Sequence, residues 1–188
     1  MDFGLGWGRW ALMAKAFGCN SYGLDLSQTR SAHAQSDGVV ILDREGVRRH
    51  KFDFINADWV FEHIPDPFET LVLLRDALKT KGLISISVPT ADDIRRRLSI
   101  MDWQAPKGAS NSLNPVAPLE HINCFKRRTL VKMAATAHMK EVHLRLNKSF
   151  QLGKGMSTLR RIGKNVVVPL VPGLKRDNIL LMRSGDDG

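Results

Sequence analysis

The stretch that decides the fold is Asp2–Gly8, DFGLGWG, in which three glycines at alternate positions follow an acidic residue. A helix-like run, Arg9–Phe17, comes directly after it, and Gly18 is placed to end that helix. A short strand pattern, Ser21–Asp25, then ends in a carboxylate. Glycine is needed where a ligand must approach the main chain without meeting a Cβ, and an acid ending the second strand can accept both ribose hydroxyls of an adenosine. The stretch therefore predicts a loop that binds a nucleotide-type cofactor.

The glycine spacing also bears on which cofactor binds. The dinucleotide fingerprint G-x-G-x-x-G/A has a small third residue that lets the helix pack under a pyrophosphate. Counted from Gly4, that third position is Arg9, which is neither glycine nor alanine. A nicotinamide dehydrogenase is therefore disfavoured.

The pattern D-x-G-x-G-x-G resembles the cofactor loop of class I S-adenosylmethionine (SAM)-dependent methyltransferases. A second series resembles one large branch of these enzymes, FDxI…VxEHxxDP…LKpGG…xxVP, which includes the ubiquinone-biosynthesis O-methyltransferases. The matching segments here are Phe52–Ile55, Val60–Pro67, Leu78–Gly82 and Ile86–Pro89.

A third, weaker match runs from Leu119 to Val142 and resembles EHxxxFxxxTLxxxxxxxGF. Two positions depart from the family pattern. Lys81 stands where the family usually has a glycine, and His138-Met139 replace its Gly-Phe. The resemblance covers about residues 2–146 and implies SAM as the cofactor.

The order of strand and helix patterns agrees with this resemblance. Ser27–Ser36 reads as a helix capped by Ser27, and Val39–Leu42 as a buried strand. Asp66 is placed to cap a further helix with Pro67 at its first position, and Lys79–Gly82 is expected to stop it. Alternating strands and helices imply parallel pairing with right-handed crossovers.

The expected fold is one Rossmann-like, three-layer α/β domain over residues 1–188, with a mostly parallel sheet. Val142–Leu146 and Asn178–Met182 would form a C-terminal antiparallel hairpin. Residues 99–121 are expected to form a loop or lid, and residues 149–176 a basic insert. Because only Met1 precedes Asp2, we expect the first strand to be largely missing through N-terminal truncation.

The resemblance assigns roles to individual residues. The loop glycines would shape the backbone beneath the methionine part of SAM, with Asp2 near its ammonium group. Asp25 would hold the ribose hydroxyls, while Leu26 packs on the adenine edge and Asp43 is a candidate for the adenine amino group. The full set of cofactor-binding residues expected is Asp2, Gly4, Gly6, Gly8, Asp25, Leu26, Asp43, Asn56 and Ala57.

Methyl transfer to oxygen gains from a general base. His63 follows the fourth strand, near the expected mouth of the site, and His121 lies in the loop that could cover it. For both, ordering the local loop is the alternative role. Glu62, His63 and Asp66 are close in sequence but need not converge in space, and no metal site is expected.

The composition limits the metal sites and the cellular locations that can be expected. The 188 residues carry a formal net charge of +9 and only two cysteines, with no zinc-ligand spacing. No apolar run is long enough to span a bilayer, and the chain is expected to be cytoplasmic. Residues 1–94 carry a net charge of −3 and residues 95–188 a net charge of +12. This asymmetry leaves contact with a nucleic acid or with a membrane surface open.

The sequence thus predicts SAM-dependent methyl transfer to an oxygen, nitrogen or carbon atom of a small-molecule or glycan-linked acceptor. A nucleic-acid methyltransferase is one alternative, favoured by the basic half alone, because Asn-Ala-Asp-Trp stands where [DN]-P-P-[YF] would follow the fourth strand. The other alternative is a catalytically inactive SAM-fold fragment that acts as a binding module.

Overall fold

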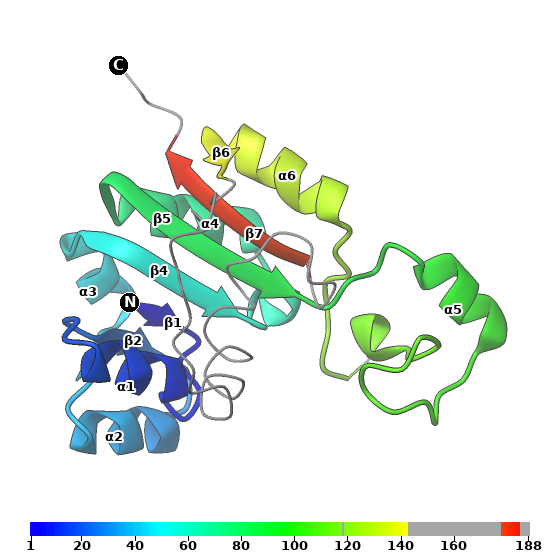
Figure 1. The fold of residues 1–188 in the computed structure, drawn as a ribbon, viewed down its shortest axis with the longest axis horizontal. Coiled ribbons are helices and arrows are strands. Elements are labelled where there is room, and N and C mark those ends of the chain that lie inside the picture. Colours follow the sequence, from blue (N-terminus) through cyan, green and yellow to red (C-terminus); the bar gives the residue numbers. More distant parts are fainter. Residues whose placement is uncertain (118, 143–177, 185–188) are drawn as a thin grey trace, which may run out of the picture.

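The structure, a computed structural model, describes residues 1–117, 119–142 and 178–184. Its centre is a seven-stranded sheet in the order β3-β2-β1-β4-β5-β7-β6 (Figure 1). The strands β1 to β5 pair in parallel, and β7 pairs antiparallel with both β5 and β6. This arrangement confirms the expected α/β fold with a C-terminal antiparallel pair. The strands are β1 (Asp2–Phe3), β2 (Tyr22–Leu24), β3 (Val40–Ile41), β4 (Phe52–Asp58), β5 (Leu78–Val88), β6 (Met139–Glu141) and β7 (Asn178–Ser184).

Helices connect most of the strands, and several of them were predicted. The α-helices are α1 (Arg9–Ala16), α2 (Gln28–Ser36), α3 (Arg44–Arg49), α4 (Pro67–Asp76), α5 (Ile94–Ile100) and α6 (Arg127–Thr136), and the 3-10 turns are η1 (Phe61–His63) and η2 (Asn114–Val116). Two predicted caps are confirmed: the Ser27 side chain accepts from Arg30 N, and the Asp66 side chain accepts from Glu69 N. Such bonds satisfy amide groups that have no partner within the helix.

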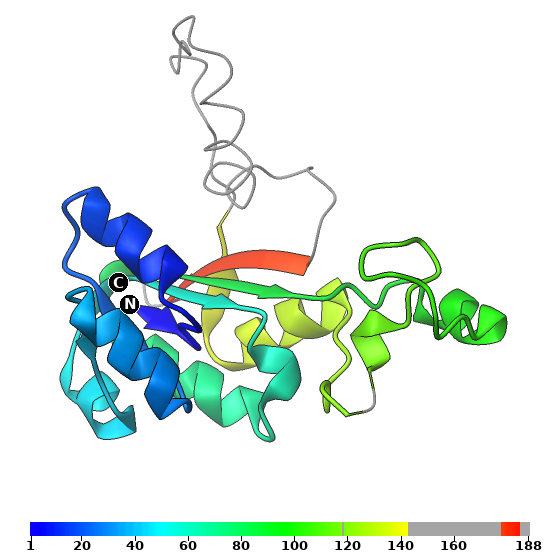
Figure 2. The same cartoon turned by 90° about the horizontal axis from the view of Figure 1, so that it is seen from below.

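Two groups of buried side chains hold the layers together. Ile55, Ile84 and Ile86 of the central strands are fully buried against a group from the turn η1 and the helices α4 and α6. A smaller group joins Leu5 and Ala11 to Ala34 and Val39, so that α1 packs with α2. Figure 2 shows α1 on one face of the sheet and α4 with α6 on the other. The result is the three-layer architecture expected for alternating strands and helices.

One predicted boundary is wrong. Helix α4 ends at Asp76, and Lys79–Gly82 belongs to β5, which begins at Leu78. Leu78 pairs with Phe52, and the register then shifts before Phe54 pairs with Leu83. Lys81 has a φ of 68° in this irregular stretch, so the basic and glycine residues mark a bulge and not a helix end.

The C-terminal predictions are only partly within the described residues. The strand β6 ends at Glu141, before the predicted strand Val142–Leu146, whose residues 143–146 lie outside the described ranges, as does the predicted insert at 149–176. The predicted last strand is confirmed as β7. No helix among the described residues has the length and apolar character that crossing a membrane requires.

Beyond the C-terminal end of β5, the chain leaves the sheet and forms a separate projection, which we call the α5 lobe (residues 94–116). It contains α5 and η2, and both views show it standing away from the helices that cover the sheet (Figures 1 and 2). The lobe occupies most of the stretch expected to be a loop or lid.

Candidate functional site

A cavity of about 590 Å³ opens where the chain leaves β1, β2 and β4 at their C-terminal ends. In parallel α/β sheets this edge is where ligands bind, because adjacent loops diverge there. Of the residues predicted to bind a cofactor, those that line the cavity are Gly4, Gly6, Asp25 and Leu26; His63 lines it as well.

The glycine loop forms one wall, and its conformation explains the glycines. Gly4 has a φ of +75°, and a Cβ there would lie 2.3 Å from Val60 Cγ2. Gly6 has a φ of +54° with open space around its Cα. Gly8 does not line the cavity: a Cβ there would lie 2.9 Å from Ala34 Cβ, so Gly8 lets the start of α1 approach α2. The loop thus needs glycine for two different reasons.

Asp25 is fixed by the main chain on both sides of the cavity. Its Oδ2 accepts from Gly6 N at 2.8 Å, and its Oδ1 accepts from Ser27 N at 2.8 Å. The carboxylate therefore joins the glycine loop to the start of α2. Each oxygen still has a lone pair for a further donor. Leu26, which is 98% exposed, extends beside it.

Asp2 and Asn56 lie beneath the loop and do not line the cavity. Both are buried, and Asn56 Nδ2 donates to Asp2 Oδ1 at 2.9 Å. Burial raises the pKa of the Asp2 carboxyl to about 6, although the Asn56 hydrogen bond opposes this shift. Ala57 is fully buried in the core. These residues couple the loop to β4, because Asp2 pairs with Asn56 in the sheet.

Asp43 is a helix cap, a role that was not predicted from the sequence. Its Oδ1 accepts from Gly46 N at 2.6 Å and caps α3, a helix that no pattern predicted. Asp43 is not among the residues that line the cavity, whereas its neighbour Arg44 is, together with Arg30 of α2. Neither arginine carried a motif by which sequence reasoning could have selected it.

The His63 and His121 rings lie side by side, although 57 residues lie between the two histidines in the sequence. Their ring centroids are 4.8 Å apart, and His63 Nδ1 lies 2.5 Å from Glu120 O. His121 is buried, and burial, followed by the nearby His63, lowers the pKa of its imidazole. A neutral His121 therefore lies behind the more exposed His63 at the rim of the cavity.

Glu62 joins this pair. Potential ligand atoms of Glu62, His63 and His121 all lie within 4.8 Å of one another, whereas Asp66, the third member of the set considered from the sequence, caps α4. The backbone of Glu62 also anchors the later loop, because its carbonyl accepts from Ile122 N and Asn123 N. The close approach of η1 and the loop around His121 is thus fixed by main-chain bonds.

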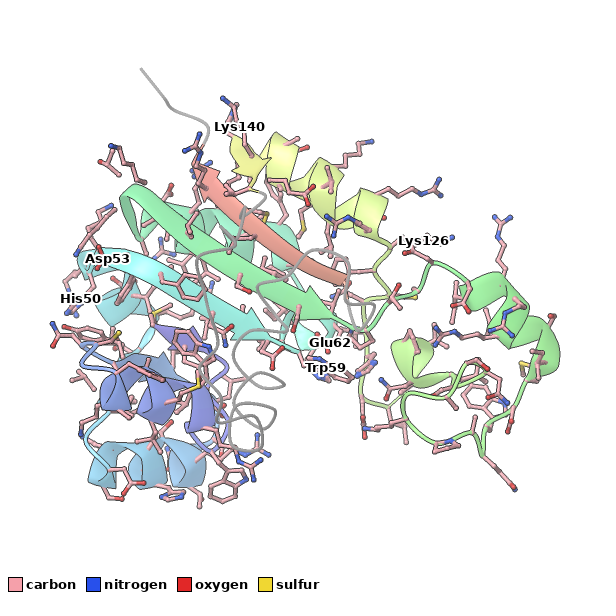
Figure 3. The ribbon with its side chains drawn as sticks, in the orientation of Figure 1. His50, Asp53, Trp59, Glu62, Lys126 and Lys140 are labelled. Atoms are coloured by element: carbon pink, nitrogen blue, oxygen red, sulfur yellow. The ribbon has the colours of Figure 1, made fainter. Side chains whose placement is uncertain are left out.

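Trp59 is a site residue that sequence reasoning missed. It follows β4 directly and has a φ of 56°, a conformation that bulky residues rarely adopt. Figure 3 places Trp59 and Glu62 just beyond the C-terminal end of β4. Trp59 lines the cofactor-side cavity and also a second cavity on the side of the α5 lobe. No sequence pattern distinguishes a tryptophan with a positive φ from an ordinary aromatic residue after a strand.

The glycine spacing alone does not decide the cofactor. Counted from Gly6, the small third position of the dinucleotide fingerprint falls on Ala11, which is fully buried. The glycine spacing therefore does not disfavour a nicotinamide cofactor, in contrast to the count from Gly4.

Comparison with known proteins is more decisive. The model of a family described as a methyltransferase domain matches residues 1–143. None of the curated proteins matches the sequence. Among solved structures, a SAM-dependent methyltransferase from Thermotoga maritima, described as a possible histamine N-methyltransferase, is 19% identical with a TM-score of 0.54, over 74% of this chain and 62% of that one.

Two other structures extend over nearly the whole chain. A SAM-dependent methyltransferase from Archaeoglobus fulgidus is 18% identical with a TM-score of 0.59, over 96% of this chain and 82% of that one. Magnesium protoporphyrin IX methyltransferase from Synechocystis PCC 6803, solved with bound SAH, is 13% identical with a TM-score of 0.59, over 97% and 73%. At these identities the likeness shows the fold.

Proposed function

The chain belongs to the methyltransferase-domain family whose model it matches, and from that premise we propose that it transfers the methyl group of SAM to a small-molecule or glycan-linked acceptor. SAM supplies an activated methyl group on a sulfonium. The protein's contribution is then mainly to hold the acceptor atom in line with that methyl group. The chain spans 62% of the Thermotoga structure, so the activity of the whole protein is part of the proposal.

The observation that carries the proposal is the cavity between the glycine loop and Asp25. Gly4 lets Val60 pack against the loop where a Cβ would clash, and Asp25 is oriented by the main-chain amides of Gly6 and Ser27. A carboxylate held in this way accepts strong hydrogen bonds from a diol such as a ribose. These residues fit SAM, with Gly4 and Gly6 beneath it, Asp25 on its ribose and Leu26 beside its adenine.

The other predicted residues receive supporting roles in this proposal. Asp2 and Asn56 hold the glycine loop against β4 from below, and Ala57 keeps the core tight behind them. Gly8 lets α1 pack on α2, and Asp43 holds the start of α3, so that Arg44 faces the cavity. Of these residues, we place Asp2 nearest to the ammonium group of SAM.

His63 is the candidate general base, because it lines the cavity and its ring is partly exposed. His121 is a positioning residue: it packs edge-on to His63 and is held neutral by burial. This arrangement suits proton removal from a hydroxyl or amine acceptor.

The test is the fate of a radiolabelled methyl group. The protein is incubated with methyl-labelled SAM and separate pools of small metabolites, polysaccharides and RNA. We expect label in the first or second pool, and none with Asp25→Ala. Label in RNA would contradict the proposed acceptor class, and no transfer to any pool by a chain that binds SAM would support the inactive binding module.

A further inference from the structure

The second cavity, of about 640 Å³, lies between the C-terminal end of β5 and the α5 lobe. Its lining includes Pro89 and Thr90, which follow β5, and Arg97, Lys107 and Asn114 of the lobe. It meets the cofactor-side cavity at Trp59, which lines both. A molecule in this second cavity could therefore contact the same tryptophan as a molecule in the glycine-loop cavity.

Trp59 is held firmly in that position. Its backbone N donates to Ser87 O on β5 at 3.0 Å, and the preceding residue, Asp58, is bonded by the Ser87 hydroxyl. A φ of 56° costs energy for a bulky residue and persists only where the surroundings impose it. Trp59 is 37% exposed, so part of this residue remains available to a ligand. Aromatic faces of this kind favour planar or apolar groups.

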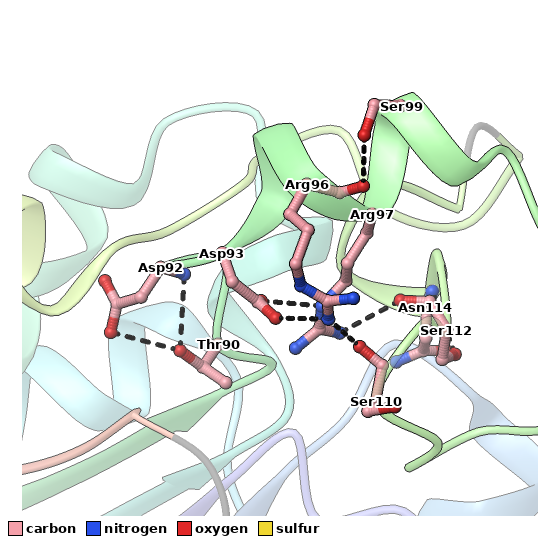
Figure 4. A network of polar contacts seen from close by, with 9 residues as sticks. All are labelled: Thr90, Asp92, Asp93, Arg96, Arg97, Ser99, Ser110, Ser112 and Asn114. Carbon is pink, nitrogen blue, oxygen red and sulfur yellow. Dashed lines mark hydrogen bonds and ion pairs between the residues drawn. The ribbon is translucent and has the colours of Figure 1, made fainter.

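The charged side chains that line the second cavity are all positive. Arg97 and Lys107 line it, and no aspartate or glutamate does among the described residues. Figure 4 shows how the arginine is held: Arg97 Nε donates to Asp93 Oδ1 at 2.6 Å and its Nη1 donates to Ser112 O at 2.9 Å. Within the described part of the chain, Nη2 of Arg97 makes no hydrogen bond. The two N–H donors of Nη2 are thus left for a ligand.

The neighbouring acids do not cancel these cations. Asp93 is shared between Arg96 and Arg97, so the three side chains together keep one positive charge. Burial acts to raise the pKa of Asp93, but the hydrogen bonds from both arginines outweigh it and lower that pKa. Lys107 Nζ lies 3.4 Å from Glu120 Oε2, and both side chains are more than half exposed. Exposed pairs of this kind contribute little, so Lys107 can turn to another anion.

We propose that this second cavity is the acceptor site, and that it takes a small acceptor with an acidic group between Arg97 and Lys107 and a flat or apolar part against Trp59. The inference rests on the proposed function, because it takes the glycine-loop cavity as the SAM site. It narrows the acceptor class to anions such as carboxylates, sulfonates or phosphates.

The test uses a matched pair of fluorescent probes, 8-anilinonaphthalene-1-sulfonate and its neutral analogue N-phenyl-1-naphthylamine. Both present the same flat apolar body, and only the first carries an acidic group. Lys107→Gln should weaken the sulfonate at least threefold and Lys107→Glu at least tenfold, while the neutral amine changes less than twofold. Lys140→Gln, which removes the same charge from β6 outside the cavity, should change neither affinity.

SAM binding is measured on the same samples by calorimetry, which separates the two proposals. Lys107→Glu should bind SAM as the unmodified chain does, which also shows that the variant is folded. Sulfonate affinity unchanged by Lys107→Glu, or an equal loss for both probes, would overturn the acceptor-site inference and leave the SAM site untouched. Failure of the unmodified chain to bind SAM would overturn the proposed function instead.

Discussion

The two cavities that meet at Trp59 are built by different means. The cofactor-side cavity depends on main-chain geometry, through left-handed glycines and an Asp25 carboxylate held by two amides. The second cavity, on the side of the α5 lobe (the lobe-side cavity), depends on charged side chains, with Arg97 held by Asp93 and Ser112. Backbone geometry tolerates very few residue types, whereas ion pairs can be rebuilt in many ways. Substitutions in the cofactor-side cavity should therefore lower stability and SAM affinity strongly, and substitutions in the lobe-side cavity only slightly.

The largest expected effect is at Gly4. Gly4→Ala places a Cβ 2.3 Å from Val60 Cγ2 at a φ of +75°. Strain of the backbone and overpacking together should cost about 3 kcal/mol of stability. SAM affinity should fall about 100-fold, because about 3 kcal/mol of binding free energy would be lost if the loop moves. Denaturant unfolding and calorimetry measure the two quantities.

Gly18→Ala is the matched control. Gly18 has a similar φ of +83°, but a Cβ there would meet nothing within 4 Å. It should cost about 1 kcal/mol through backbone strain alone and leave SAM affinity unchanged. If both variants bind SAM equally well, the close approach of Gly4 to Val60 is not what shapes the site.

Asp2→Asn tests the buried support of the loop. The folded-state pKa of about 6 lies above the ordinary value of 3.8, so the folded state holds the proton more tightly. This contribution to stability is fully present below pH 4 and is lost as pH rises through about 6. A shift of about two units corresponds to about 3 kcal/mol, as an upper bound.

The asparagine keeps an oxygen for Asn56 but carries no charge. The free energy of unfolding of the variant should thus exceed that of the unmodified chain by about 2 kcal/mol at pH 7.5, and the two should be equal at pH 3.5. Thermal unfolding followed from pH 3.5 to 7.5 measures this difference. A constant difference across the range would mean that the pKa of Asp2 is the same in the folded and the unfolded chain.

Asp93→Ala tests the lobe. It removes the partner of Arg96 and Arg97 in a pair whose carboxylate side chain is 41% exposed. The cost in stability should be about 1 kcal/mol, because solvent screens exposed ion pairs. SAM affinity should not change, while trypsin should cut the lobe faster. A loss of SAM binding as large as that of Gly4→Ala would contradict the expected difference in sensitivity between the two cavities.

The smallest expected effects are at Lys81 and His138, which have φ values of 68° and 55°. His138→Gly and Lys81→Gly should each stabilise the chain by about 0.5–1 kcal/mol, since glycine adopts this conformation without strain. Lys132→Gly, within the helix α6, should instead destabilise it by about 1 kcal/mol. Destabilisation by His138→Gly would mean that its side chain contributes to packing.

The cofactor-side cavity was easier to predict from the sequence than the lobe-side cavity. The glycine loop, the position of Asp25 and the helix starts at Ser27 and Asp66 were all predictable, because local backbone chemistry admits few residue types there. The cap at Asp43 was missed because α3 is short and polar, so that no apolar period marks it as a helix.

The lobe-side cavity could not have been predicted. Its walls come from Trp59, the end of β5 and two parts of the α5 lobe, which are distant in sequence and share no periodicity. The pairing of Arg97 with Asp93 is local and ordinary for a helix, so nothing in the sequence shows that it orders one wall of a cavity. The meeting of His63 and His121 was suggested only through the family resemblance.

The central claim is that the glycine-loop cavity holds SAM through Asp25. Calorimetric titration with SAM, and in parallel with NADH, tests it most directly for the unmodified chain, Asp25→Ala and the control Asp37→Ala on the exposed end of α2. We expect micromolar SAM binding, no NADH binding, a loss of at least 100-fold for Asp25→Ala and no change for Asp37→Ala. NADH binding, or SAM binding that Asp25→Ala leaves intact, would contradict the claim.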